Sequence, residues 1–152
     1  MKQNCVALIP ARSGSKRIIN KNIFVLNNHP LMAYSIQAAI DSEIFKDIFC
    51  ITDSEEYAEI AKYYGAQVPF IRPKSISTDT SPDIEWVKWT LLKLKEINKL
   101  YENYCILRPT SPFRQSQTIK RAMKIFSKDL SATSLRAVEK CRQHPGKMWI
   151  AK

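Results

Sequence analysis

The chain has 152 residues, a size typical of one compact domain with a buried core. Hydrophobic residues make up 45% of the chain, and no apolar run approaches the roughly 18 residues of a membrane helix or forms a signal-peptide core before Pro10, so we expect a soluble cytoplasmic protein. The net charge of +10 makes nucleic acid a candidate ligand. The basic residues do not follow one helix with interleaved aromatic residues, however, so nucleic acid is not the expected partner.

Short apolar runs alternate with amphipathic segments along the chain. Continuous apolar runs indicate strands that are buried on both faces, and repeats at i, i+3 or i+4, and i+7 indicate helices. This order predicts a single three-layer α/β domain over residues 1–152, with a mostly parallel sheet and helices on both faces. The expected strands are 5–9, 48–52, 67–71, 104–107 and 132–138, and the apolar faces of the expected helices include Met32 and Ile36, Tyr57 and Ala61, Val87 and Leu94, and Ile119 and Met123.

The loop that leaves the first expected strand, residues 10–22, is basic and contains small residues. The first forty residues include five basic side chains and no acidic one, which favours a small polyanion as ligand. Gly14 lets backbone N–H groups approach phosphate oxygens, the Arg12 guanidinium can bind two oxygens, and Lys16 and Lys21 add point charges. The loop lacks the Gly-x-x-x-x-Gly-Lys-Ser/Thr pattern of a P-loop, so we predict a phosphate site of another kind at the carboxyl end of the strand.

Asp53 follows the second expected strand and precedes a helix. With Glu56 three residues later it has the spacing of a capping box, which is our first interpretation. A carboxylate at the end of such a strand can instead face Mg²⁺, and the sequence does not decide between the two.

The cysteines do not form a redox or metal motif. Cys5, Cys50 and Cys105 fall within apolar runs, and with Cys141 they contain no Cys-x-x-Cys pair. We therefore expect reduced thiols, the first three of them in the core.

A larger pattern joins these segments. The run Ile9-Pro-Ala-Arg-x-Gly-Ser-Lys-x-Ile-x-x-Lys-Asn22 resembles the opening signature of the sialate cytidylyltransferases, the CMP-N-acylneuraminate synthetases. The resemblance continues, in the family's order and spacing, through residues 33–36, 52–53, 72–80 and 107–114, and so covers most of the chain. It implies a fold like the nucleotide-diphospho-sugar transferases, and an enzyme that uses Mg²⁺ to convert CTP and an acidic nine-carbon sugar into a CMP-sugar and pyrophosphate.

The resemblance also implies roles for particular positions. Arg12 and Lys21 would offset charge during nucleotidyl transfer, and Arg108 replaces a Gln that often touches the sugar in sialate enzymes. Asn22 has a second interpretation as a turn or cap residue. Asp83, with the hydroxyl-rich loop before it, has a second interpretation as an N-terminal cap of a helix with Pro82 in its first turn. Arg17 is expected at the surface. The positions expected to contact CTP or the sugar are Ala11, Arg12, Ser15, Lys16, Lys21, Asn22, Arg72, Ser81, Asp83 and Arg108.

Two alternatives stay open. A cytidylyltransferase for a legionaminate-, pseudaminate- or ketodeoxyoctonate-like sugar would share the CTP site, although Ser15-Lys-x-Ile-x-x-Lys-Asn22 favours the sialate branch over the ketodeoxyoctonate branch. The family's chains run further and carry an Asp-x-Asp metal motif and much of the dimer region there. We therefore expect a C-terminally incomplete chain from a homodimeric enzyme, with a non-catalytic nucleotide-binding fragment as the second alternative.

Overall fold

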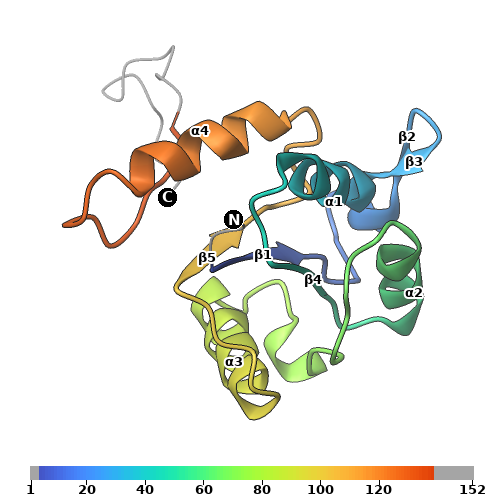
Figure 1. Ribbon diagram of the computed structural model, residues 1–152. Coiled ribbons are helices and arrows are strands. Elements are labelled where there is room, and N and C mark those ends of the chain that lie inside the picture. Colours follow the sequence, from blue (N-terminus) through green and yellow to red (C-terminus); the bar gives the residue numbers. More distant parts are fainter. Residues whose placement is uncertain (1–3, 139–152) are drawn as a thin grey trace, which may run out of the picture. The chain divides into compact units, whose positions relative to one another are not determined.

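The computed structural model describes residues 4–138 (Figure 1). The chain divides into two compact units, residues 1–120 and 121–152. The first unit contains the sheet, and helix α4 (Ser116–Phe126) begins in it. The described part of the second unit contains the end of α4 and residues 127–138, which form no further helix or strand. No helix among residues 4–138 is long and apolar enough to cross a membrane.

The sheet of the first unit has three parallel strands in the order β4-β1-β5. They are β1 (Cys5–Pro10), β4 (Asp47–Ile51) and β5 (Asn103–Ile106). Strand β1 lies in the middle and is buried on both faces, because its apolar run leaves no polar side to face water. Since all three strands run the same way, their carboxyl ends lie at one edge of the sheet.

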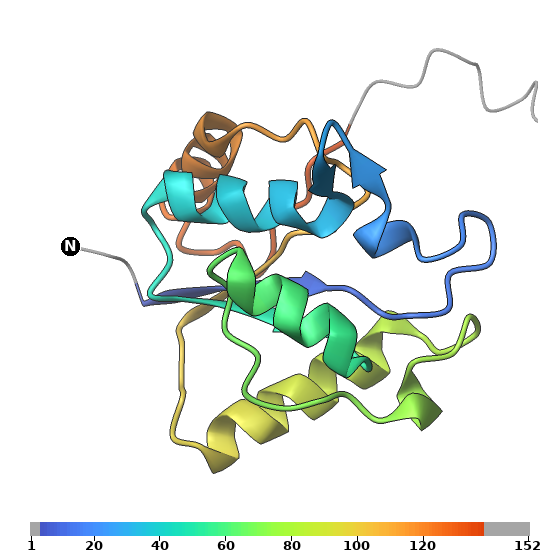
Figure 2. The same ribbon diagram turned by 90° about the vertical axis from the view of Figure 1, so that its right-hand side faces the viewer.

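Helices cover both faces of this sheet. Figure 2 shows α1 (Leu31–Ser42) above the sheet and α3 (Asp83–Glu96) below it, and Figure 1 shows α2 (Glu55–Tyr63) on the β4 side. Because side chains alternate along a strand, Val6 and Leu8 of β1 both face the α3 side. The core cluster there consists of Val6, Leu8, Phe49, Ile51, Trp86, Leu94 and Tyr101. The three-layer α/β prediction and all four expected helices are confirmed.

Two predicted strands are wrong. In segment 67–71 only Gln67 bridges to Phe49, with its N–H 2.8 Å from the Ile48 oxygen. Pro69 has no N–H to continue a ladder, so the segment remains a loop. In segment 132–138 the apolar pattern does not correspond to burial, because Val138 is 87% exposed and no strand forms.

A short hairpin precedes α1, and the periodicity of the sequence does not predict it. Strands β2 (Val25–Leu26) and β3 (His29–Pro30) pair in antiparallel register. The two residues between them, Asn27 and Asn28, have φ angles of 46° and 68°, as a tight hairpin turn requires. Strands of two residues are too short to show an alternating pattern. The hairpin follows the short 3-10 helix η1 (Lys21–Ile23), and a second one, η2 (Lys74–Ile76), precedes α3.

The thiols of the described residues are free, as predicted. Cys5 and Cys50 are fully buried, and Cys105 is partly buried. Burial raises the pKa of Cys5 and of Cys50 to about 12, and that of Cys105 to about 11. Cys141 lies outside the described residues. These three thiols are therefore structural rather than reactive.

Candidate functional site

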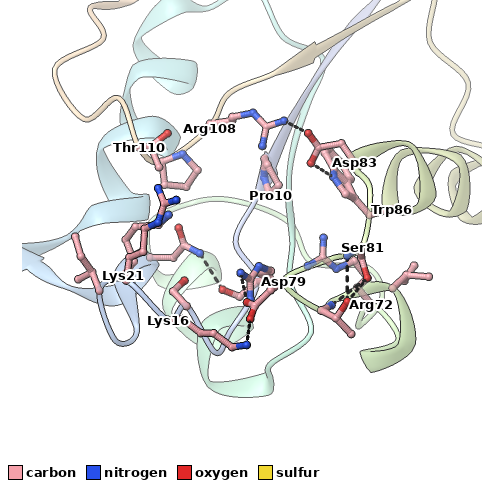
Figure 3. A pocket seen from close by; sticks show the side chains of 18 residues that line it. Pro10, Lys16, Lys21, Arg72, Asp79, Ser81, Asp83, Trp86, Arg108 and Thr110 are labelled. Carbon is pink, nitrogen blue, oxygen red and sulfur yellow. Dashed lines mark hydrogen bonds and ion pairs between the residues drawn. The ribbon is translucent and has the colours of Figure 1, made fainter. Parts of the chain in front are cut away.

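A cavity of about 540 Å³ opens at the carboxyl edge of the sheet. Three segments line it: the loop after β1, the segment from Arg72 to Trp86, and residues 108–110 after β5 (Figure 3). This is the place that a parallel sheet offers to a ligand, because its strands end there and loops of separate segments meet. Of the ten predicted site residues, nine line the cavity: Arg12, Ser15, Lys16, Lys21, Asn22, Arg72, Ser81, Asp83 and Arg108.

Ala11 does not line the cavity. It is fully buried, and its N–H donates to the Ile51 oxygen at 3.0 Å, which extends the pairing of β1 with β4 by one residue. Its methyl group therefore belongs to the core. Arg17, expected at the surface, is exposed but lies on the cavity wall.

Two of the predicted phosphate-binding cations share one carboxylate. Asp79 Oδ1 accepts from Arg12 Nη2 at 2.7 Å, and Asp79 Oδ2 lies 2.5 Å from Lys16 Nζ (Figure 3). The hydrogen bond from Lys16 and that from Arg12 lower the pKa of Asp79 below its ordinary value. Arg12 also donates from Nη1 to the carbonyl oxygens of Ser13 and Gly14, both at 3.2 Å. The sequence interpretation missed Asp79, although it is the acidic residue of the 72–80 segment that carried part of the resemblance.

Asp53 does not cap α2, and among residues 4–138 it belongs to no group of three or more possible metal ligands. Its Oδ1 accepts from the Ser13 N–H at 2.6 Å, and its Oδ2 from Ser13 Oγ and Lys74 Nζ, both at 2.8 Å. The cap of α2 is Ser54, whose Oγ accepts from the Tyr57 N–H at 3.4 Å. The capping-box prediction is wrong because the Asp53 side chain faces the β1 loop. Burial by itself raises the pKa of Asp53, but the bonds from Lys74 and Ser13 outweigh it and lower that pKa.

Asn22 and Arg72 are buried polar residues on the cavity wall. Asn22 Nδ2 donates to the Arg12 carbonyl at 2.9 Å, which links η1 to the β1 loop. Arg72 is 3% exposed, and its Nε donates to Ser77 Oγ at 2.8 Å. Burial lowers the pKa of the Arg72 guanidinium below its usual value. Each of these side chains thus has a structural partner at the position where it lines the cavity.

The start of α3 and the end of β5 meet through Asp83 and Arg108. Asp83 Oδ1 accepts from Trp86 Nε1 at 2.9 Å, and Oδ2 accepts from Arg108 Nη2 (Figure 3). The bond from Trp86 and then that from Arg108 lower the pKa of Asp83. The α3 cap is Pro82 itself, without a side-chain bond, so Asp83 does not cap the helix. Ser81 Oγ accepts from the Thr78 N–H at 3.2 Å, within its own loop.

The cavity wall is strongly cationic. Six of its residues are basic and two are acidic, a formal excess of 6 − 2 = +4. Figure 3 shows Lys21 and Arg72 on opposite sides of the cavity, so positive charge surrounds it rather than lying in one patch. Such a wall favours a ligand with several negative charges. The basic residues are Arg12, Lys16, Arg17, Lys21, Arg72 and Arg108, and the acidic ones are Asp79 and Asp83.

The sequence pattern of the cytidylyltransferase family matches residues 6–144 of this chain. The chain belongs to the cytidylyltransferase family. It is 44% identical over 126 residues to an N-acylneuraminate cytidylyltransferase of Escherichia coli O18:K1:H7, covering 83% of this chain and 29% of that protein. It is 42% identical over 120 residues to a CMP-N,N'-diacetyllegionaminic acid synthase of Legionella pneumophila, covering 79% of this chain and 52% of that protein.

A solved structure gives the same fold for this cytidylyltransferase chain. A CMP:2-keto-3-deoxy-manno-octonic acid synthetase complexed with CTP superimposes with a TM-score of 0.70 and 16% sequence identity, covering 84% of this chain and 48% of that one. The chain therefore spans about half or less of the length of each of these three proteins.

The Mg²⁺ expected from the resemblance finds no protein ligand set in the described part of this cytidylyltransferase chain. Residues 4–138 contain no group of three or more His, Cys, Asp or Glu side chains that fits a metal ion. The carboxylates at the site, Asp53, Asp79 and Asp83, each accept from a basic side chain. Paired in this way, the three carboxylates do not fit a divalent cation, which usually takes unpaired carboxylate oxygens or phosphate oxygens.

Proposed function

We propose that this chain supplies the CTP-binding part of an enzyme that activates an acidic nine-carbon sugar of the N-acylneuraminate type. CTP and the sugar would give a CMP-sugar and pyrophosphate. The observation that carries the proposal is the cavity at the carboxyl edge of the sheet, where the cations of the β1 loop and the polar residues of the 72–83 segment line one space. The family membership of residues 6–144 supports the same chemistry.

In the proposed reaction the anomeric hydroxyl of the sugar attacks the α-phosphorus of CTP. An oxygen–phosphorus bond to the sugar forms, the bond from the α-phosphorus to the oxygen that bridges it to the β-phosphate breaks, pyrophosphate leaves with that oxygen, and the hydroxyl proton is released to solvent. Arg12, Ser15, Lys16, Lys21 and Asn22 would bind the triphosphate, with Arg12 and Lys21 offsetting the charge that develops on the α-phosphate and the leaving group. Catalysis of this kind depends on positioning and on charge neutralisation.

The opposite side of the cavity would bind the base. Cytosine presents an amino donor beside ring-nitrogen and carbonyl acceptors. The Arg72 guanidinium offers donors and the Asp83 carboxylate offers an acceptor, with Ser81 between them in the chain. Since Lys21 and Arg72 lie on opposite sides in Figure 3, a nucleotide that spans the cavity would place its phosphates at one and its base at the other.

Arg108 would contact the sugar acid. Its planar guanidinium suits a carboxylate, to which it can donate two parallel hydrogen bonds. It already binds the carboxylate of Asp83, so a sugar carboxylate would replace that carboxylate as the partner of Arg108.

A legionaminate-type sugar is the second candidate substrate. The observation in its favour is the Legionella relative, whose 42% identity is close to the 44% of the Escherichia coli relative. Pseudaminate- or ketodeoxyoctonate-like sugars would use the same CTP residues. The use of Mg²⁺, the homodimer and the cytoplasmic location remain predictions of this proposal.

Calorimetric titration of CTP, ATP and GTP tests the nucleotide. CTP is expected to bind more tightly than either purine nucleotide, because the 72–83 segment suits a pyrimidine edge. Equal affinity for all three would remove the proposed base contacts. Pyrophosphate release with CTP, Mg²⁺ and either N-acetylneuraminate or N,N'-diacetyllegionaminate then compares the sugars, and binding without turnover on any sugar would favour the non-catalytic alternative.

A further inference from the structure

Two buried aspartates stand at opposite ends of strand β4. Asp47 is its first residue, and Asp53 follows its last residue by two positions. Their side chains are similarly buried, with 9% and 3% exposed. Asp47 serves the end of the sheet far from the cavity, and its carboxylate accepts from three side chains, Tyr101 at 2.5 Å, Gln67 at 2.9 Å and Lys99 at 3.2 Å.

Asp53 serves the cavity end in a different way. Both donors of Ser13, the backbone N–H and the hydroxyl, go to its carboxylate at 2.6 and 2.8 Å. Ser13 follows Arg12, whose guanidinium donates to the carbonyls of Ser13 and Gly14. Gly14 has a φ of 65°, the left-handed conformation that turns the loop at this point. The Ser13 and Gly14 carbonyls therefore hold the Nη1 side of the Arg12 guanidinium, while Asp79 binds its Nη2 side.

Lys74 connects the arrangement to the 72–86 segment. Its ammonium group lies 2.8 Å from Asp53 Oδ2 and 3.3 Å from Ser13 Oγ. Lys74 begins η2, two residues after Arg72. One carboxylate thus connects the proposed phosphate loop to the segment that carries a proposed base contact, although it does not line the cavity itself.

We infer that Asp53 is a positioning residue, which sets the loop 12–16 and the segment 72–77 in the relative geometry that a nucleoside triphosphate needs. The inference rests on the proposed function of the cavity. Asp53 acts through Ser13 and Lys74 and does not touch the nucleotide. Only an ionised carboxylate accepts from all three donors, whereas the amide of an Asn would turn an NH₂ group toward at least one of them.

The test compares Asp53→Asn with Asp47→Asn as the matched control. Affinity for tripolyphosphate and for CTP is measured by calorimetry, and stability by thermal unfolding. Both variants are expected to lower the unfolding temperature. Asp53→Asn is expected to lower the affinity for both ligands by roughly tenfold or more, because a charge-assisted network is lost. Asp47→Asn is expected to change either affinity by less than about twofold. Equal losses in the two variants would overturn the inference, as would unchanged affinity in Asp53→Asn.

A double-mutant cycle separates positioning from loss of structure. Ser13→Ala removes the hydroxyl donor and keeps the backbone N–H, so it is expected to lower the affinity for tripolyphosphate less than Asp53→Asn does. If Asp53 acts through Ser13, the Ser13→Ala change has a smaller effect when Asp53→Asn is already present. Fully additive effects would overturn the inference. Where Asp53→Asn does not fold, Ser13→Ala and Lys74→Met carry the comparison with Asp47→Asn.

The two ligands also distinguish this inference from the proposed function. A wild-type chain that binds neither tripolyphosphate nor CTP overturns both. A chain that binds tripolyphosphate but does not prefer CTP to ATP overturns the base assignment. In that case, a loss of tripolyphosphate affinity in Asp53→Asn but not in Asp47→Asn would still support the positioning role.

Discussion

Arg12 Nη2 lies 2.7 Å from Asp79 Oδ1, so the arginine proposed to bind phosphate is already paired with a carboxylate. Lys16 contacts the other oxygen of the same group. The two partners are 67 residues apart in the sequence and come from different segments that line the cavity. A phosphate that binds Arg12 and Lys16 must therefore compete with Asp79 for them.

Asp79→Asn is expected to increase the affinity for tripolyphosphate by about three- to tenfold, because it removes the competing negative charge while keeping a side chain of the same shape. Calorimetric titration measures the change. Glu59→Gln is the charge-matched control, since Glu59 pairs with Lys62 on α2 and does not line the cavity. Weaker binding by Asp79→Asn would mean that Asp79 organises Arg12 and Lys16 rather than competing for them.

Lys21→Ala is expected to weaken CTP binding more than Arg17→Ala does. Lys21 is the first residue of η1 and is half-buried on the cavity wall, whereas Arg17 is exposed. Loss of a charge-assisted contact costs about 1.5–3 kcal/mol, and loss of an exposed charge costs little. The two dissociation constants are compared under the same salt conditions. Equal weakening would contradict the assigned geometry of the loop.

Stability is expected to fall in acid through Asp47 and Asp53. The pKa of each carboxyl is lowered in the folded chain: burial raises it, but hydrogen bonds from Tyr101, Gln67 and Lys99 to Asp47, and from Lys74 and Ser13 to Asp53, outweigh burial. A lowered folded pKa adds stability above the unfolded pKa of about 4, and that stability is lost as pH falls through the folded pKa.

Urea unfolding at about pH 6 and about pH 3 measures this loss. In Asp47→Asn the difference in unfolding free energy between the two pH values is expected to be smaller than in the wild type, because one of the carboxyls no longer titrates. A variant with the same pH dependence as the wild type would show that Asp47 does not contribute.

The buried thiols are expected to resist alkylation in the folded chain. Burial raises the pKa of Cys50 to about 12, so little thiolate is present at neutral pH, and the side chain is fully buried. Iodoacetamide labelling followed by peptide mass spectrometry should show slow modification of Cys5, Cys50 and Cys105 in buffer and rapid modification in urea. Fast labelling of Cys50 in buffer would contradict its place in the core.

Much of the site was predictable because its residues are close in sequence. One stretch of eleven positions contains Arg12, Ser15, Lys16, Lys21 and Asn22. Because this stretch follows the end of β1, all five residues line the same cavity. The resemblance to a known family added Arg72, Ser81, Asp83 and Arg108, which local patterns alone do not connect to that loop.

The errors have local causes. Residues 67–71 have strand-like composition, but Pro69 interrupts the backbone donors, so that one bridge forms instead of a ladder. Asp53 and Glu56 have capping-box spacing, yet Ser54 caps the helix. Spacing describes what a side chain can reach along its own helix and omits competing partners from elsewhere in the chain.

Neighbouring residues and their periodicity were enough to predict the strands β1, β4 and β5, the helices α1 to α4 and the cationic chemistry of the loop after β1. The partners of Asp53 and Asp79, in contrast, depend on how the chain packs. Asp53 binds Ser13 across 40 positions, and Asp79 binds Arg12 across 67. A carboxylate bonds the donors that the packed sheet brings within about 3 Å of it, and a one-dimensional pattern does not contain those distances.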